Sequence, residues 1–120
     1  MHVAYTAGPY RGAGEWAVWQ HIQRASEVAH ELWAMGFAVV CPHRNTMMFG
    51  SATISDDVWL AGDLELLRRS DVVVMLPGWE RSEGARGELA EAKRCGLAVY
   101  YWPEDREALA AMARAEATNA

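Results

Sequence analysis

The sequence lacks several features that would mark particular classes of protein. Its net charge of −5 at pH 7 leaves it without the basic surplus of a general nucleic-acid binder. No apolar run is long enough to cross a bilayer, and residues 1–3 do not start the charged and apolar segments of a signal peptide. Internal repeats, low-complexity tracts and linkers are absent as well. We therefore expect a cytoplasmic protein whose 120 residues form one domain, with no membrane or nucleic-acid partner.

Cysteine is scarce, and its spacing argues against metal binding. Cys41 and Cys95 have no other ligand type at the spacing of a metal site, and both lie in apolar stretches. We expect them to be buried free thiols in a reducing compartment. His21 and His30 also lack partners at ligand spacing, so we expect no metal and no cofactor.

Tryptophan, in contrast, is abundant for a chain of this length. We expect most of these side chains in the core, although several could stack on a planar ligand or line a dimer interface. The six are Trp16, Trp19, Trp33, Trp59, Trp79 and Trp102.

Hydrophobic periodicity predicts strands that alternate with helices. The predicted strands are residues 2–7, 37–41, 71–75 and 96–101. The predicted helices are residues 15–35, one that Ser55 caps, one that begins near Ser82 and includes 88–94, and one over about 104–114. Residues 116–120 are expected to fray. Alternation with short joins implies a small doubly wound α/β domain, with a parallel sheet of four to five strands and helices on both faces.

A strand, a Pro-Gly break and a helix start follow one another closely between residues 71 and 94. Loops at the carboxyl ends of strands are where open α/β sheets bind ligands. Ser82 is a natural N-cap, and Gly84 lets a ligand approach the backbone. The free amides of that helix start favour an anion such as a phosphate.

Two other segments have the composition of binding loops. Residues 8–14 are rich in glycine but match neither the dinucleotide-binding pattern nor a P-loop. This loop either cradles a phosphate with Arg11 or is a tight turn with a solvated arginine. Residues 42–54 have no clear periodicity, which is typical either of a functional lid or binding loop or of a flexible excursion.

Two carboxylates fall on the sides of predicted helices whose apolar spacing indicates that they face the core. Glu88 lies at the edge of the stripe formed by Ala85, Leu89 and Ala92. Its carboxylate is either paired or poised for chemistry, or it curls outward to solvent. Asp63 lies about 40° from the apolar residues one turn before and one turn after it. Alone it would be a structural aspartate, but two such acids on adjacent βα units are the equipment of acid/base and nucleophilic work on glycosidic bonds.

Four short motifs occur in order along residues 3–101. They are Tyr5-x-Ala7-Gly8-Pro9-Tyr10-Arg11-Gly12, Cys41-Pro42-His43, Asp63-Leu64 before Ser70-Asp71-Val72-Val73-Val74, and Ser82-x-Gly84-x-x-x-Glu88-Leu89. Together they resemble the nucleoside 2-deoxyribosyltransferase superfamily, and within it the small 2′-deoxynucleoside 5′-phosphate N-hydrolases.

The resemblance implies a role for each matching residue. Glu88 matches the nucleophile that forms a glycosyl ester, Asp63 the acid that assists departure of the base, and Tyr5 the tyrosine that positions the nucleophile. The residues assigned to substrate binding are Gly8, Pro9, Arg11, His43, Ser82 and Gly84. Serine at position 82 matches the phosphate hydrolases, whereas the transferases place an aspartate there, so the resemblance favours a nucleotide as substrate.

Three departures from the family pattern concern activity more than fold. Arg86 stands where relatives often have glycine, and Pro9 stands where some hydrolases have serine. Ala110 falls in the region where a partner subunit of the hydrolases offers a serine to the phosphate.

The resemblance thus leaves three hypotheses. The favoured one is an N-glycosidase that hydrolyses a ribo- or deoxyribonucleoside 5′-monophosphate. The others are a transferase that exchanges bases and a non-catalytic nucleotide-binding module. The resemblance also implies a homodimer or higher homo-oligomer, with Trp16 and Trp19 as candidate contacts.

Overall fold

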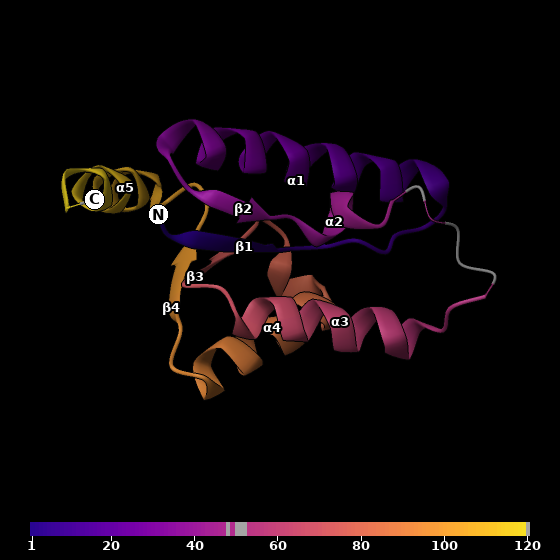
Figure 1. Cartoon of the computed structure of the whole chain (residues 1–120). Helices are drawn as coiled ribbons and strands as arrows, with labels where there is room; N and C mark the ends of the chain where they lie inside the picture. Colours follow the sequence, from indigo (N-terminus) through magenta and orange to yellow (C-terminus); the bar gives the residue numbers. More distant parts are fainter. Residues whose placement is uncertain (48, 50–52, 120) are drawn as a thin grey trace.

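The computed structural model describes residues 1–47, 49 and 53–119, and over these residues strands alternate with helical segments (Figure 1). In chain order the elements are β1 (Val3–Ala7), α1 (Glu15–Met35), β2 (Ala38–Val40), α2 (Pro42–Asn45), α3 (Asp56–Arg68), β3 (Val72–Met75), the 3-10 turn η1 (Trp79–Arg81), α4 (Glu83–Arg94), β4 (Ala98–Tyr101) and α5 (Arg106–Asn119). No helix in these residues is long and apolar enough to span a membrane.

The four strands form one parallel sheet in the order β2-β1-β3-β4. β1 is central, and its Tyr5 pairs with Val40 of β2 on one side and Val73 of β3 on the other. The chain runs outward from β1 to β2 and then returns to β3 on the opposite side of β1. The strand order therefore reverses between β1 and β3, which is where ligands bind in open α/β sheets. The predicted doubly wound fold is confirmed.

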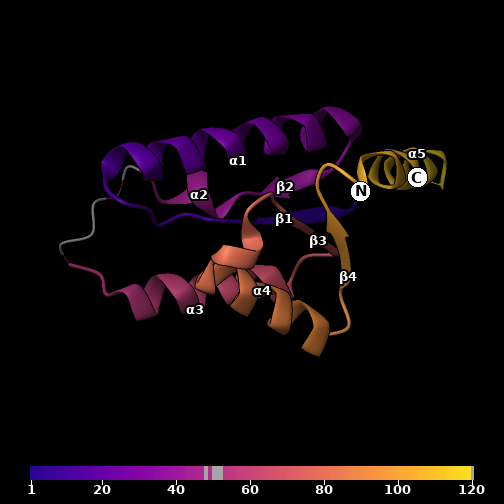
Figure 2. The same cartoon turned by 180° about the vertical axis from the view of Figure 1, so that it is seen from behind.

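Helices cover both faces of the sheet, and successive residues of β1 point to opposite layers (Figures 1 and 2). Ala4 packs in the core beneath α1 and α5, together with Leu32 and Leu109. Tyr5 packs in the core beneath α3 and α4, together with Leu67 and Leu89. The side chain of Tyr5 therefore points toward the helices that carry the two predicted acids.

The helix boundaries differ from the predicted ones at two places. Residues 42–45 form the short helix α2, because Pro42 suits the first turn and the Cys41 carbonyl accepts from the amides of Arg44 and Asn45. Positions 48 and 50–52 of the predicted lid or binding loop lie outside the described residues. At the other end, α5 continues to Asn119, so the expected fraying at 116–119 is wrong. Glu116 holds this end by accepting from the N-terminal ammonium group at 3.0 Å.

The expectation that most tryptophans are buried is wrong. Trp102 alone is buried among the six, Trp59 and Trp79 are half-buried, and Trp16, Trp19 and Trp33 are exposed. The three exposed side chains lie on α1, whose core-facing stripe consists of smaller aliphatic residues. The thiols differ from expectation as well, since Cys41 is half-buried and Cys95 is exposed at the end of α4.

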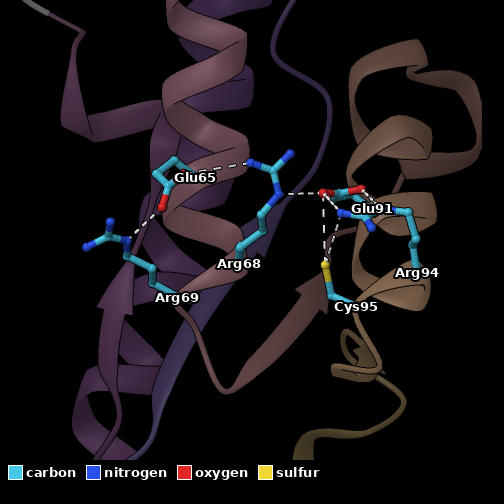
Figure 3. A network of polar contacts seen from close by, with 6 residues as sticks. All are labelled: Glu65, Arg68, Arg69, Glu91, Arg94 and Cys95. Atoms are coloured by element: carbon cyan, nitrogen blue, oxygen red, sulfur yellow. Dashed lines mark hydrogen bonds and ion pairs between the residues drawn. The ribbon is translucent and has the colours of Figure 1, made fainter.

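A network of ion pairs joins α3 to α4 (Figure 3). Glu91 of α4 accepts from Arg68 Nε of α3 at 2.5 Å and from Arg94 at 2.7 and 2.8 Å. Glu65 pairs with Arg69 at 2.7 Å and approaches Arg68 at 3.8 Å. The network fixes the two helices that carry Asp63 and Glu88 relative to one another.

Candidate active site

The buried hydroxyl of Tyr5 donates a hydrogen bond to Glu88 Oε2. Tyr5 comes from the central strand, and Glu88 comes from the second turn of α4. Ala85, Leu89 and Ala92 form the buried stripe of α4 as predicted, and Glu88 is half-buried at its edge. Of the two alternatives for Glu88, the structure shows the paired, inward-facing one.

The surroundings of Glu88 shift its proton affinity in opposing directions. Burial raises the pKa of Glu88 to about 7, the negative charge of Asp63 raises it as well, and the hydrogen bond from Tyr5 lowers it. Burial and the charge of Glu88 also raise the pKa of Tyr5, so the phenol keeps its proton and remains a donor at physiological pH.

Asp63 of α3 is the third member of this group. It is half-buried, and the loss of hydration raises its pKa. Its charge acts on both Glu88 and Tyr5, which places the three groups within electrostatic reach of one another. Together the three groups could serve two kinds of step. Glu88 could act as a nucleophile that Tyr5 orients, and Asp63 could act as an acid or a base.

Ser82 and Gly84 lie at the start of α4. Ser82 Oγ accepts from the Ala85 amide at 3.1 Å, which confirms the predicted N-cap. The hydroxyl can still donate its own proton to a ligand while it accepts this bond. Gly84 is exposed in the first turn of the helix. The amides of this turn point in the direction that favours an anion.

Gly8 and Pro9 pack the end of β1 against the loop that follows β3. A Cβ on Gly8 would lie 2.7 Å from Leu76 Cβ, so only glycine fits this contact. His43 of α2 is buried, and its Nε2 lies 2.7 Å from the Pro9 carbonyl, to which it donates. Burial lowers the pKa of His43, so the ring is neutral, and its hydrogen bond to the Pro9 carbonyl holds the loop after β1 in place.

Arg11 is exposed, and its Nη2 pairs with Asp56 at 2.6 Å at the start of α3. The charge of Glu83, next to Ser82, also acts on Arg11 and raises its pKa after the larger effect of Asp56. The glycine-rich loop, the start of α3 and the start of α4 therefore lie close together. Periodicity could not reveal the contacts of Asp56 with Arg11 or of the Pro9 carbonyl with His43, because each joins loop positions far apart in sequence.

Two of the three departures from the family pattern lie on helices at different distances from this group. Arg86 is exposed on α4, two residues before Glu88. Ala110 is half-buried on α5, whose buried residues Leu109 and Ala113 belong to the opposite layer of the sheet. Within one chain, Ala110 thus does not join the Tyr5–Glu88 group.

Two cavities lie at the same end of the sheet. One measures about 410 Å³ and the other about 230 Å³, and both are bounded by Pro77, Gly78, Trp102 and Pro103. Tyr5, Asp63 and Glu88 line neither of them. In the part of the chain that the structure describes, no cluster of three or more histidine, cysteine or acidic side chains could hold a metal ion.

The fold is that of the nucleoside 2-deoxyribosyltransferase-like proteins, which confirms the resemblance that the motifs indicated. Residues 2–101 match the family described as a domain of unknown function, DUF4406, and the chain belongs to that family.

Among solved structures, the chain is similar to a 2-deoxyribosyltransferase from the psychrotolerant bacterium Bacillus psychrosaccharolyticus. The two are 19% identical with a TM-score of 0.59, and the match covers 82% of this chain and 70% of that chain. That enzyme is described as a suitable biocatalyst for the synthesis of antiviral and antitumoral nucleosides. No curated protein matches the sequence.

Proposed function

We propose that this protein is an N-glycosidase that hydrolyses the N-glycosidic bond of a ribo- or deoxyribonucleoside 5′-monophosphate. The observation that carries the proposal is the hydrogen bond from buried Tyr5 to Glu88, with Asp63 close enough to act on both. A carboxylate nucleophile needs a fixed orientation, and a phenol that never loses its proton supplies it.

In the first step a carboxylate oxygen of Glu88 attacks the anomeric carbon, and the bond from that carbon to the base nitrogen breaks. The electron pair of that bond stays on the base, which takes a proton from Asp63. This step requires Asp63 to hold the proton while Glu88 is ionised, and burial raises the pKa of Asp63 in that direction. The products of the step are the free base and a glycosyl ester on Glu88.

In the second step Asp63, now ionised, takes a proton from a water molecule that attacks the same carbon. The bond to the Glu88 oxygen breaks, and the sugar phosphate leaves with a hydroxyl on its anomeric carbon. Glu88 returns as a carboxylate and Asp63 as the acid, so the site is restored.

The phosphate of the substrate is assigned to the start of α4. The Ser82 hydroxyl, the Gly84 amide and the helix dipole all favour an anion there. The charge of Glu83 raises the pKa of Arg11, which indicates that Arg11 lies near the start of α4. A phosphate bound there would compete with Asp56 for the Arg11 guanidinium. Gly8, Pro9 and His43 shape the loop on the other side of the substrate.

Transfer of the sugar to a second base is the second candidate, and the fold likeness to a 2-deoxyribosyltransferase favours it. The two reactions share the first step and differ in whether water or a base resolves the ester. A non-catalytic nucleotide-binding module is the third possibility, and it predicts that ligand affinity survives Glu88→Ala while no turnover exists.

The test is incubation of the purified chain with a panel of ribo- and deoxyribonucleoside monophosphates, with chromatography of the free bases. We expect base release from at least one member, loss of it in Glu88→Gln, and full retention in Glu107→Gln, whose side chain is exposed on α5. Addition of a second free base separates transfer from hydrolysis, because transfer yields a new nucleotide. No base release and no exchange by folded protein would contradict both enzymatic proposals.

A further inference from the structure

The cavity of about 410 Å³ lies on the other side of the sheet from the proposed catalytic group. Its floor includes Val28, Leu76 and Trp102, which belong to the core beneath α1 and α5, whereas Tyr5 belongs to the core beneath α3 and α4. Its volume falls within the range of about 300–1,000 Å³ that is common for small-molecule sites.

Two arginines and a histidine line this cavity from two different elements. Arg24 and His21 come from one face of α1, and Arg81 comes from η1. Burial and the charge of Arg24 lower the pKa of His21, so its ring is neutral at pH 7 and offers a hydrogen bond. Glu27 is the one acidic residue in the lining, so positive charge exceeds negative charge there.

The two arginines differ from most others in having no protein partner. Within residues 1–47, 49 and 53–119, neither Arg24 nor Arg81 makes an ion pair or a side-chain hydrogen bond. Those that do are Arg11, Arg44, Arg68, Arg69, Arg94 and Arg106. Of the four arginines without such a partner among these residues, two line the same cavity. Their forked donors are therefore available to an anion.

The position of Arg81 is set by the loop beneath it. Gly78 has a φ of +89°, and a Cβ there would lie 3.3 Å from Arg81 Nη2 and 3.1 Å from Pro9 Cγ. The guanidinium thus folds back over Gly78, beside Pro9, and both of these residues line the cavity. A larger residue at 78 would push this guanidinium away.

The remaining wall is apolar and aromatic. Trp102 and Pro103 line the cavity, and Arg106 lies over the Trp102 ring at 5.9 Å from its centroid. A planar apolar group could pack against this wall while an anionic group reaches the arginines.

We infer that this cavity is a second ligand site, separate from the catalytic group, that binds a phosphate monoester carrying a small planar apolar group. Arg24 and Arg81 hold the phosphate from α1 and η1, and His21 donates to it. Trp102 and Pro103 contact the planar group. Because η1 leads directly to Ser82, the ligand would connect α1 to the segment that begins the proposed catalytic helix. The inference goes beyond the proposed function and does not depend on turnover at Glu88.

The test uses phenyl phosphate, which has no glycosidic bond, in an NMR titration of the nitrogen-15-labelled chain. The amide of Gly78 and the indole N–H of Trp102 report on the cavity, and the amide of Gly84 reports on the start of α4. We expect saturable shifts of the Gly78 and Trp102 signals. Arg24→Gln and Arg81→Gln should each weaken this binding about tenfold or more, since each removes a charge-assisted contact.

Two control variants make the result specific. Arg114→Gln removes an exposed arginine of α5 and should leave the affinity unchanged. Glu88→Gln should also leave it unchanged, so that failure of the glycosidase proposal and failure of this one are distinguishable. Benzoate, with one charge and two oxygens, should bind more weakly than phenyl phosphate.

Three results would overturn the inference. They are the absence of shifts at Gly78 and Trp102 with wild-type protein, an affinity that is the same in both arginine variants as in wild type, and binding of benzoate as tight as that of phenyl phosphate. Circular dichroism of each variant confirms that it is folded, and the two arginine variants serve as independent tests.

Discussion

The Tyr5 hydroxyl of the central strand donates to Glu88 of α4, a residue 83 positions further along the chain. Both groups lie in a part of the protein where charge is poorly solvated, and their proton affinities respond to each other. Burial raises the pKa of Glu88 to about 7, and the hydrogen bond from Tyr5 opposes that rise. This contact therefore fixes the direction in which the carboxylate points, and it partly offsets the rise in the pKa of Glu88 that burial causes.

Tyr5→Phe should slow base release and shift its pH dependence. The variant removes a hydrogen bond to a charged group, for which a loss of about 10- to 100-fold in kcat is expected. It also raises the pKa of Glu88, so the acidic limb of the pH profile should move to higher pH. A profile of kcat against pH checks both, and an unchanged limb would mean that Tyr5 does not act on Glu88.

Asp63→Asn should affect the departure of poor leaving groups most. The variant removes the proton donor of the first step. Natural bases should be released far more slowly, whereas a substrate with a nitrophenolate leaving group, which needs no proton, should keep most of its rate. Similar losses with both leaving groups would contradict the role of Asp63 as the acid.

Glu88→Gln should stabilise the protein at high pH. A carboxyl whose pKa is raised from 4.5 to about 7 adds stability below pH 4.5 and loses it as the pH rises through 7. The variant does not titrate, so its free energy of unfolding at pH 8 should exceed that of wild type by at most about 3 kcal/mol. Its unfolding temperature should therefore be higher at pH 8, and the difference should shrink toward pH 5. Thermal unfolding at both pH values checks this, and Glu107→Gln should follow wild type throughout.

Glu91→Gln should have the opposite pH dependence. Hydrogen bonds from Arg94 and Arg68 hold the pKa of Glu91 at about 2, so its contribution to stability is present above pH 4.5 and is lost as the pH falls toward 2. The midpoint of thermal unfolding should differ most between wild type and variant above pH 4.5. A difference that persists unchanged at low pH would show that the network in Figure 3 acts by packing and not by charge.

Ser82→Ala and Ser82→Asp should separate the two roles of Ser82. Alanine removes the N-cap and should cost about 1 kcal/mol of stability, while aspartate restores a cap. Aspartate, however, repels a phosphate, so KM for a monophosphate should rise strongly and KM for the matching nucleoside should not. Steady-state kinetics with both substrates checks this. Equal changes in KM for the monophosphate and the nucleoside would contradict the placement of the phosphate at the start of α4.

The homo-oligomer stays a prediction, and the exposed tryptophans of α1 offer a way to test it. Trp16 is 70% exposed and Trp19 is 42% exposed. If they lie in a dimer interface, Trp16→Arg with Trp19→Arg should convert a dimer to a monomer in sedimentation velocity. A wild-type chain that sediments as a monomer would contradict the expectation itself.

The sheet and the position of Glu88 at the edge of the α4 stripe could be predicted from the sequence, since each has a local signature, whereas the catalytic roles of Tyr5, Asp63 and Glu88 stay predictions. Apolar runs predicted the strands, and helical spacing placed Glu88 beside the stripe of α4. Helical spacing also placed Asp63 on the inner side of α3. What the pattern could not supply was the partner of each group.

The failures have a common physical cause, which is that burial depends on what packs against a side chain. Tryptophan counts as apolar in a composition wherever it lies. The face of α1 that packs on the sheet is nevertheless filled by smaller residues, so Trp16 and Trp33 are exposed to solvent. Cys95 lies in an apolar stretch of the sequence, but it follows the last residue of α4 and is exposed there beside the charged side chain of Arg94.

The central claim is that Glu88 becomes covalently bound to the sugar during turnover, and mass spectrometry tests it most directly. The chain is mixed with a nucleoside monophosphate that it hydrolyses, quenched in acid within one turnover, and digested. We expect a peptide that contains Glu88 and carries the added mass of the sugar phosphate, with no adduct in Glu88→Gln. Base release by wild-type protein with no adduct, together with full activity in Glu88→Gln, would contradict it.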